Sequence, residues 1–150
     1  MAALSEIYNF LPLTEDLLTS GQPTREQFSL IAAVGVKTVI NLALQTSSSA
    51  LPEEETLVKS LGMNYVHIPV IWESPTRANL ESFFFTMEAQ SGEKVFVHCA
   101  ANMRVSAFVA LYRILRLGWD RNKAFQSTYY IWDPFTDEVW GKFIELALAK

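Results

Sequence analysis

The chain of 150 residues is long enough to bury a substantial core, and 50% of its residues are hydrophobic. With 13% aromatic residues, the composition is typical of a compact globule and not of a disordered segment. A net charge of −4, with 12 scattered Lys and Arg, argues against nucleic-acid binding. No uncharged apolar stretch is long enough to span a bilayer, so we expect no membrane segment.

The cysteine content and the start of the sequence bear on the cellular compartment. A single cysteine cannot form an internal disulfide, which fits a reducing compartment. The opening residues lack a basic segment followed by an apolar core, so no signal peptide is predicted. We therefore expect a cytoplasmic protein; a trimmed chain that has lost a signal peptide would have the same sequence.

Hydrophobic patterns and turn residues predict strands that alternate with helices. Thr24-x-x-Gln27 is a capping box that opens a helix, and Gly35 ends it. The segment 36–42 is rich in β-branched residues, which favours a buried strand. Thr76 is a suitable N-cap for a later helix. The predicted strands are 17–20, 36–42, 64–70 and 94–98, and the predicted helices are 24–34, 52–62, 76–90, 103–117, 120–131 and 137–149.

This alternation predicts the fold class and the position of a site. Strands joined through helices imply right-handed crossovers, so we predict an α/β fold with a mostly parallel central sheet flanked by helices, built as a single domain over residues 1–150. Ligands of such sheets bind beyond the carboxyl ends of the strands. His98 and Cys99 lie there, where the strand 94–98 gives way to a helix. The helix 103–117 is apolar nearly all round and is expected at the centre.

The residues around Cys99 resemble a known signature. VHC at a strand end, a short loop and then Ser106 opening an apolar helix is similar to the signature of cysteine-dependent protein tyrosine and dual-specificity phosphatases. Upstream, LLTSGQPTREQF, GVKTVINL and YVHIPV are similar to a bacterial branch of that superfamily that carries a domain of unknown function. The resemblance covers about residues 15–117. It implies a phosphatase-like fold and a phosphorylated substrate or another oxyanion as partner, with neither a metal nor a cofactor.

The resemblance to these phosphatases implies a role for the residues in and around this loop. A free thiol has a pKa near 8.5, and backbone N–H groups with the positive end of a following helix favour its thiolate while they bind phosphate oxygens. Cys99 would then be the nucleophile that forms a phosphocysteine, Ser106 would stabilise the departing thiolate, and His98 would fix the loop geometry. The implied phosphate cradle comprises Cys99, Ala100, Ala101, Asn102, Met103, Arg104 and Val105.

The position of the arginine departs from the signature. The family places it six residues after the cysteine, where this chain has Val105, and Arg104 comes one residue earlier. Because one helical step rotates a side chain by about 100°, two arrangements are open. Either the loop is remodelled so that Arg104 turns inward, or Val105 occupies the clamp position and phosphate binding lacks its guanidinium fork. We favour the second, because Ser106 keeps the family's register.

A second departure concerns the general acid. The family's aspartate would fall on Trp72, and Glu73 follows it, so Glu73 is the predicted acid if the loop shifts. Asp133 is a weaker candidate, because Asp before Pro is usually turn chemistry. The predicted function is hydrolysis of a phosphomonoester, including phosphotyrosine.

Two alternatives to hydrolysis are left open. A non-catalytic module that binds phosphate or another oxyanion would account for Val105 and Trp72. The spacing from Cys99 to Arg104 also matches rhodanese-type sulfurtransferases, although Ala100 stands where those enzymes commonly have arginine. The sequence leaves the substrate and the oligomeric state open.

Overall fold

Five strands form one sheet in a computed structural model that describes residues 3–149. The order across the sheet is β1-β2-β5-β3-β4, in which β2, β5, β3 and β4 are parallel and β1 is antiparallel to β2. The strands are β1 Leu11–Thr14, β2 Leu17–Ser20, β3 Thr38–Asn41, β4 Asn64–His67 and β5 Val95–His98. The predicted α/β fold with a mostly parallel sheet is confirmed.

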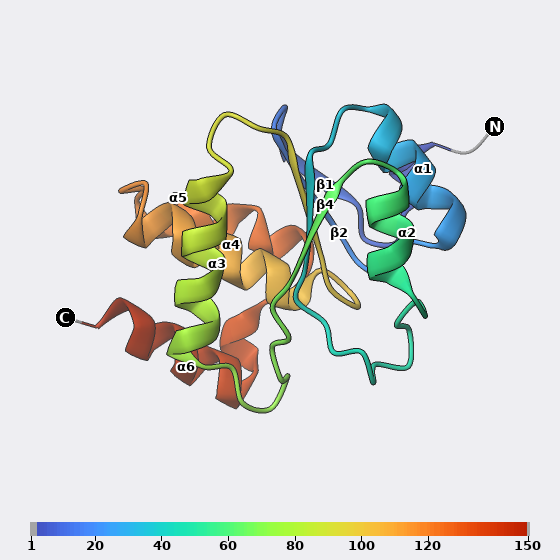
Figure 1. The fold of residues 1–150 in the computed structure, drawn as a ribbon. Coiled ribbons are helices and arrows are strands. Elements are labelled where there is room, and N and C mark those ends of the chain that lie inside the picture. Colours follow the sequence, from blue (N-terminus) through green and yellow to red (C-terminus); the bar gives the residue numbers. More distant parts are fainter. Residues whose placement is uncertain (1–2, 150) are drawn as a thin grey trace.

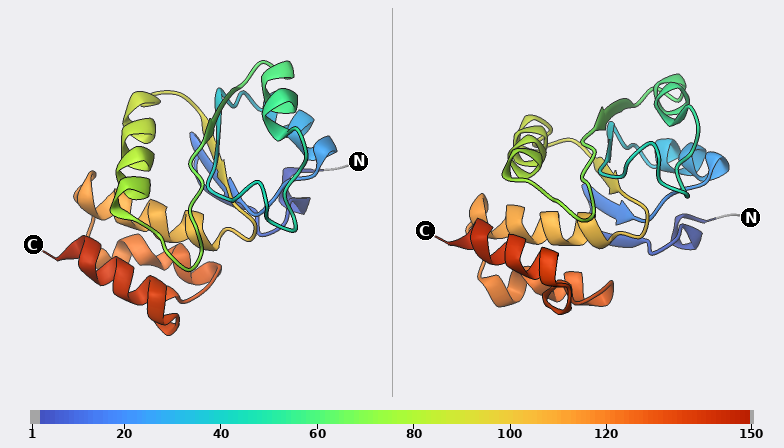
Figure 2. Two further views of the ribbon diagram at one scale, coloured as in Figure 1. Left: turned by 60° about the horizontal axis from the view of Figure 1, so that its bottom comes forward. Right: turned by 90° about the horizontal axis from the view of Figure 1, so that it is seen from below.

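Six α-helices cover the two faces of this sheet, as Figures 1 and 2 show. Helices α1 and α2 lie on one face, and the other four lie on the opposite face, where they pack over the larger of two hydrophobic clusters. The helices are α1 Arg25–Ala33, α2 Glu54–Ser60, α3 Arg77–Ala89, α4 Met103–Leu115, α5 Arg121–Gln126 and α6 Glu138–Leu148, with short 3-10 turns at Leu4–Glu6, Thr128–Tyr130 and Pro134–Thr136.

The local signals for helix starts are confirmed, with two differences in extent. Thr24 and Thr76 each form the capping box of their helix. The helix expected from residue 52 begins only at Glu54, because Glu53 adopts a left-handed conformation with φ of 58°. The helix expected over 120–131 ends at Gln126 and continues as a 3-10 turn.

Strand β1 was not predicted from the sequence. It contains Pro12, which lacks the N–H needed for a ladder in the middle of a sheet. Because β1 lies at the edge and pairs with β2 alone, its other side needs no hydrogen-bond donor. Only the position of the strand in the sheet makes this proline acceptable.

Helix α4 is the central support of the second face, as predicted. Residues 104 to 111 of this helix are all buried, and α3, α5 and α6 pack against it. Three tryptophans join the loop after β4 to the C-terminal helices. The ring centroid of Trp72 lies 5.2 Å from that of Trp132 and 5.4 Å from that of Trp140, whose indole N–H donates to the Trp72 carbonyl at 2.9 Å. Trp132 also donates from Nε1 to Ser106 Oγ at 3.1 Å, which connects this cluster to the first turns of α4.

Candidate active site

Cys99 follows β5, a central strand of the sheet, and opens the turn into α4. We call residues 99–102 the cysteine loop. A cavity of about 130 Å³ lies against this loop, and Cys99 is only 1% exposed beside it. The cavity is lined by Trp72, Cys99, Ala100, Ala101, Met103 and Arg104. Its volume suits a group the size of an oxyanion.

The first three carbonyl oxygens of the cysteine loop each accept a hydrogen bond from a residue outside the loop. The donors lie in the N-terminal segment, in the turn after β2 and at the end of β5. The contacts run from Asn9 Nδ2 to the Ala101 oxygen at 3.0 Å, from the Gln22 N–H to the Ala100 oxygen at 3.0 Å and from His98 Nδ1 to the Cys99 oxygen at 3.3 Å. With their carbonyl groups fixed, these peptide units are kept in one orientation.

The N–H groups of the same region are free to bind an anion. Within residues 3–149, the N–H groups of Ala100 and Ala101 have no hydrogen-bond acceptor. Those of the first turn of α4 have no intrahelical partner, as at any helix start, and they lie at the positive end of the helix dipole. Unpaired N–H groups around a small cavity form an anion-binding concavity.

Asn102, the last residue of the cysteine loop, takes a left-handed conformation. Its φ is 65°, which an asparagine tolerates better than most residues. The buried side chain donates from Nδ2 to the Asn9 oxygen at 3.0 Å and to Thr19 Oγ1 at 3.1 Å. Asn102 therefore fastens the cysteine loop to the N-terminal segment and to β2.

Gly21 is a point of close approach to the loop, and it yields a prediction. A Cβ at Gly21 would lie 2.6 Å from the Ala100 oxygen and 2.7 Å from Tyr8 Cδ2. We expect Gly21→Ala to lower the free energy of unfolding by about 1–3 kcal/mol, because the loop must shift. Gly141→Ala is the matched control, since its Cβ meets nothing closer than 3.5 Å inside α6, where alanine is favoured. Urea denaturation measures both; equal stability of the two variants would contradict the close approach.

Arg104 turns inward, and the expectation that Val105 occupies the clamp position is wrong. Arg104 lines the cavity together with Cys99, is 8% exposed, and donates from Nη1 to the Val70 oxygen at 2.8 Å. Val105 is fully buried in the hydrophobic cluster under α4. The left-handed Asn102 starts the helix at Met103, so the apolar face of α4 takes Val105 and the cavity side takes Arg104.

Ser106 and Glu73, the other two predicted catalytic residues, do not line this cavity. The Ser106 hydroxyl donates to the Met103 oxygen at 3.0 Å and accepts from Trp132 Nε1 at 3.1 Å, so its proton is already used. Glu73 is exposed, while its neighbour Trp72 lines the cavity. Asp133 caps the 3-10 turn that follows it, as turn chemistry predicts.

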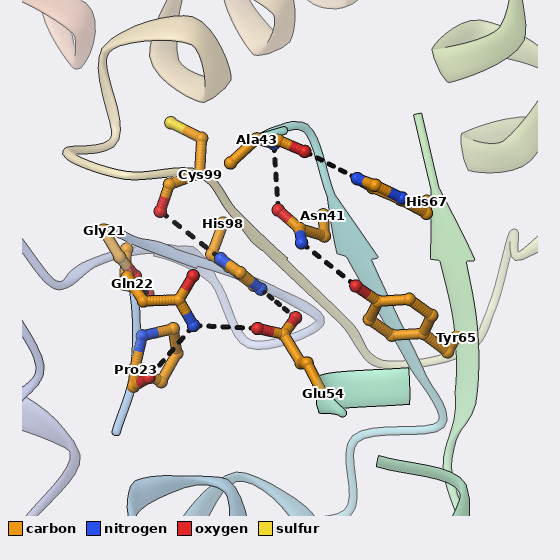
Figure 3. Close-up of polar contacts among 11 residues, drawn as sticks. Gly21, Gln22, Pro23, Asn41, Ala43, Glu54, Tyr65, His67, His98 and Cys99 are labelled. Carbon is orange, nitrogen blue, oxygen red and sulfur yellow. Dashed lines mark hydrogen bonds and ion pairs between the residues drawn. The ribbon is translucent and has the colours of Figure 1, made fainter. Parts of the chain in front are cut away.

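A buried polar cluster lies beneath the cysteine loop, on the side away from the Cys99 sulfur (Figure 3). His98 is fully buried, and its Nε2 lies 2.6 Å from Glu54 Oε2. Burial alone would raise the pKa of Glu54, but the hydrogen bond and charge of His98, with help from Gln22 and Tyr65, hold that pKa below its usual value. The sequence predicted that His98 fixes the loop geometry, but it did not point to Glu54 as its partner. The two residues lie 44 positions apart in the chain, so no local pattern connects them.

Comparison with known proteins decides the family. The model of the family described as "DSP-PTPase phosphatase fused to NAD+ Kinase" matches residues 12–133. This chain belongs to that phosphatase family. A DUF442 protein of Shewanella putrefaciens is 36% identical, with a TM-score of 0.86 over 96% of this chain and 93% of that one. The resemblance of the sequence to cysteine-dependent tyrosine and dual-specificity phosphatases is confirmed.

Two further similarities are more distant in sequence. The core catalytic domain of the PP-IP phosphatase SIW14 of S. cerevisiae is 17% identical and shares the phosphatase fold, with a TM-score of 0.77 over 93% of this chain and 85% of that one. A beta-lactamase hydrolase-like protein of Xylella fastidiosa is 29% identical over 106 residues, which are 69% of this chain and 24% of the relative. This phosphatase-family chain thus spans about a quarter of the curated relatives that it matches.

The part of the chain that the structure describes shows neither a metal-binding cluster nor a membrane-spanning helix. No group of three or more His, Cys, Asp or Glu side chains within residues 3–149 is placed to hold a metal ion. None of the helices described combines the length and apolar character that a membrane crossing requires.

Proposed function

We propose that this chain is a cysteine-dependent phosphatase that hydrolyses phosphomonoesters through a phosphocysteine intermediate. The observation that carries the proposal is the meeting of Cys99 and Arg104 at one small cavity beside unpaired loop N–H groups. The phosphatase family of the chain supports it. An arginine one residue early is thereby accommodated, because the helix starts where Arg104 can reach the cavity.

The proposed reaction has two displacements at phosphorus. The Cys99 thiolate attacks, so that a sulfur–phosphorus bond forms and the ester oxygen leaves with the electrons of the broken phosphorus–oxygen bond. Water then attacks the phosphocysteine and loses a proton to the solvent, while the sulfur–phosphorus bond breaks, its electrons return to sulfur as the thiolate, and phosphate is released. The loop N–H groups and the Arg104 guanidinium stabilise the negative charge on the phosphoryl oxygens in both steps.

The source of the leaving-group proton shapes the substrate range. Among residues 3–149, no carboxylate lines the cavity. Trp72 does line it, and Glu73, its neighbour in the chain, is the acid nearest to it in sequence. Glu73 serves as the acid when the loop between Val70 and Thr76 moves; otherwise water supplies the proton. Aryl phosphates, including phosphotyrosine, need least protonation of the leaving oxygen, so we expect them to react faster than alkyl phosphates.

A non-catalytic oxyanion-binding module is the second candidate, and a specific observation favours it. Trp72 occupies the place of the acid beside the cavity, and the Ser106 proton is committed to Met103. Both features would weaken turnover while they leave anion binding intact.

Turnover of 4-nitrophenyl phosphate by the intact chain tests the proposal. We expect phosphate release that vanadate inhibits, and vanadate should also protect Cys99 from alkylation by iodoacetamide. Vanadate protection without turnover would favour the binding module. Sulfur transfer from thiosulfate to cyanide, with no phosphate release, would favour rhodanese-like chemistry and contradict the phosphatase.

A further inference from the structure

Glu54, the first residue of α2, places a carboxylate under the cysteine loop. The residue is 5% exposed, and both of its oxygen atoms are used. Oε2 faces His98 Nε2 at 2.6 Å, and Oε1 accepts from Gln22 Nε2 at 2.8 Å. Burying a carboxylate is costly unless it is paired and hydrogen-bonded, and both conditions are met here.

The orientation of His98 follows from what its two ring nitrogens face. Nδ1 lies 3.3 Å from the Cys99 carbonyl oxygen, and Nε2 lies 2.6 Å from the Glu54 carboxylate. The two contacts lie on opposite sides of the ring, so Glu54 fixes the direction in which Nδ1 faces the Cys99 oxygen.

Each oxygen of Glu54 leads to one carbonyl group of the cysteine loop. Figure 3 shows the contacts of Glu54 with His98 and with the Gln22 side chain. Through Oε2 it orients His98, whose Nδ1 faces the Cys99 oxygen. Through Oε1 it orients the side chain of Gln22, whose backbone N–H donates to the Ala100 oxygen at 3.0 Å. One carboxylate thus braces the first two peptide groups after β5.

We propose that Glu54 is a positioning residue for the phosphate cradle: through His98 and Gln22 it holds the carbonyl groups of Cys99 and Ala100 away from the cavity, so that the loop N–H groups face the anion. This inference rests on the proposed function in taking the cavity as the phosphate site. Glu54 touches neither the cavity nor Cys99 Sγ, so its effect reaches the substrate through the shape of the loop alone.

Glu54→Ala and Glu54→Gln separate positioning from charge. The alanine variant loses both contacts, so we expect the dissociation constant of vanadate to rise about 10-fold or more. In the glutamine variant the amide oxygen still accepts from Gln22, and the amide N–H donates to a neutral His98 that keeps its Nδ1 proton. We expect its vanadate affinity to stay within about 3-fold of the wild type. Glu55→Gln is the matched control, because Glu55 is exposed and pairs with Lys59 on the helix surface.

Calorimetric titration of vanadate provides the readout. Weak binding in the alanine variant that glutamine restores supports the proposal. Unchanged binding in a folded Glu54→Ala, or an equal loss in both variants, overturns it.

A second variant covers the case in which Glu54→Ala does not fold. Gln22→Leu removes the Oε1 contact, together with the 3.0 Å hydrogen bond from Gln22 Nε2 to the Pro23 oxygen, and leaves the backbone N–H in place. A 2- to 5-fold loss of vanadate affinity supports the proposal and an unchanged affinity overturns it. Vanadate binding is measured apart from turnover. A wild type that binds vanadate and releases no phosphate would therefore refute the hydrolase while these comparisons still decide the role of Glu54.

Discussion

Replacing Cys99 by serine is expected to lower kcat/KM for 4-nitrophenyl phosphate by at least ~10⁴-fold, as removal of a nucleophile does in other covalent enzymes. A serine hydroxyl is not ionised at neutral pH, and none of the described residues that line the cavity has a side chain that could accept its proton. The phosphocysteine step would thus be lost, while the surrounding N–H groups and Arg104 stay in place. Steady-state phosphate release measures the effect.

Vanadate binding and urea denaturation of the same variant are the controls for the anion site and for folding. Because serine is nearly isosteric with cysteine, we expect Cys99→Ser to bind vanadate within about 10-fold of the wild type and to unfold at a similar urea concentration. Residual turnover above about 1% of the wild-type rate would show that hydrolysis does not pass through this sulfur. Loss of turnover together with loss of the folded state would leave the thiol without a demonstrated role.

The layers of the fold could be predicted because each rests on local signals. The capping box at Thr24, the N-cap at Thr76 and the β-branched segment before Leu42 determine their elements within a few residues. The exceptions depend on tertiary context. Strand β1 tolerates Pro12 only because it is an edge strand, and the late start of α2 depends on a left-handed Glu53 that no local pattern announces.

The candidate site was predictable in its location and less so in its geometry. The strand-to-helix position of Cys99 follows from the pattern of the sequence. The direction of Arg104 does not, because it depends on the residue at which α4 starts, and a shift of one residue turns the side chain by about 100°. Glu54 could not be found, because its contact with His98 joins the start of α2 to the end of β5, which lie 44 residues apart in the chain.

The second large effect concerns the arginine. We expect Arg104→Ala to weaken vanadate binding by about 10- to 100-fold, which corresponds to the roughly 1.5–3 kcal/mol of a charged hydrogen bond. Arg104→Lys should recover only part of this loss, because an ammonium group cannot form two parallel hydrogen bonds to one anion. The Arg104 guanidinium donates to the Val70 oxygen through Nη1 and still has other N–H groups for the ligand. The ammonium group of a lysine lacks this planar, forked arrangement of donors. Titration of vanadate into the two variants separates charge from geometry.

Moving the arginine to the family's usual position tests the geometry most strictly. In Arg104→Val with Val105→Arg, the new guanidinium would enter a fully buried apolar position next to Phe108 and Val109. We expect the free energy of unfolding to fall by about 3–5 kcal/mol, because an unpaired charge is buried. Vanadate affinity should fall as in Arg104→Ala, since no side chain replaces the lost clamp. Val105→Ala is the control, expected to lose about 1–3 kcal/mol of stability with little change in vanadate binding. A stable double variant that binds vanadate more tightly would mean that the loop can adopt the longer spacing, and that α4 does not fix which residue faces the anion.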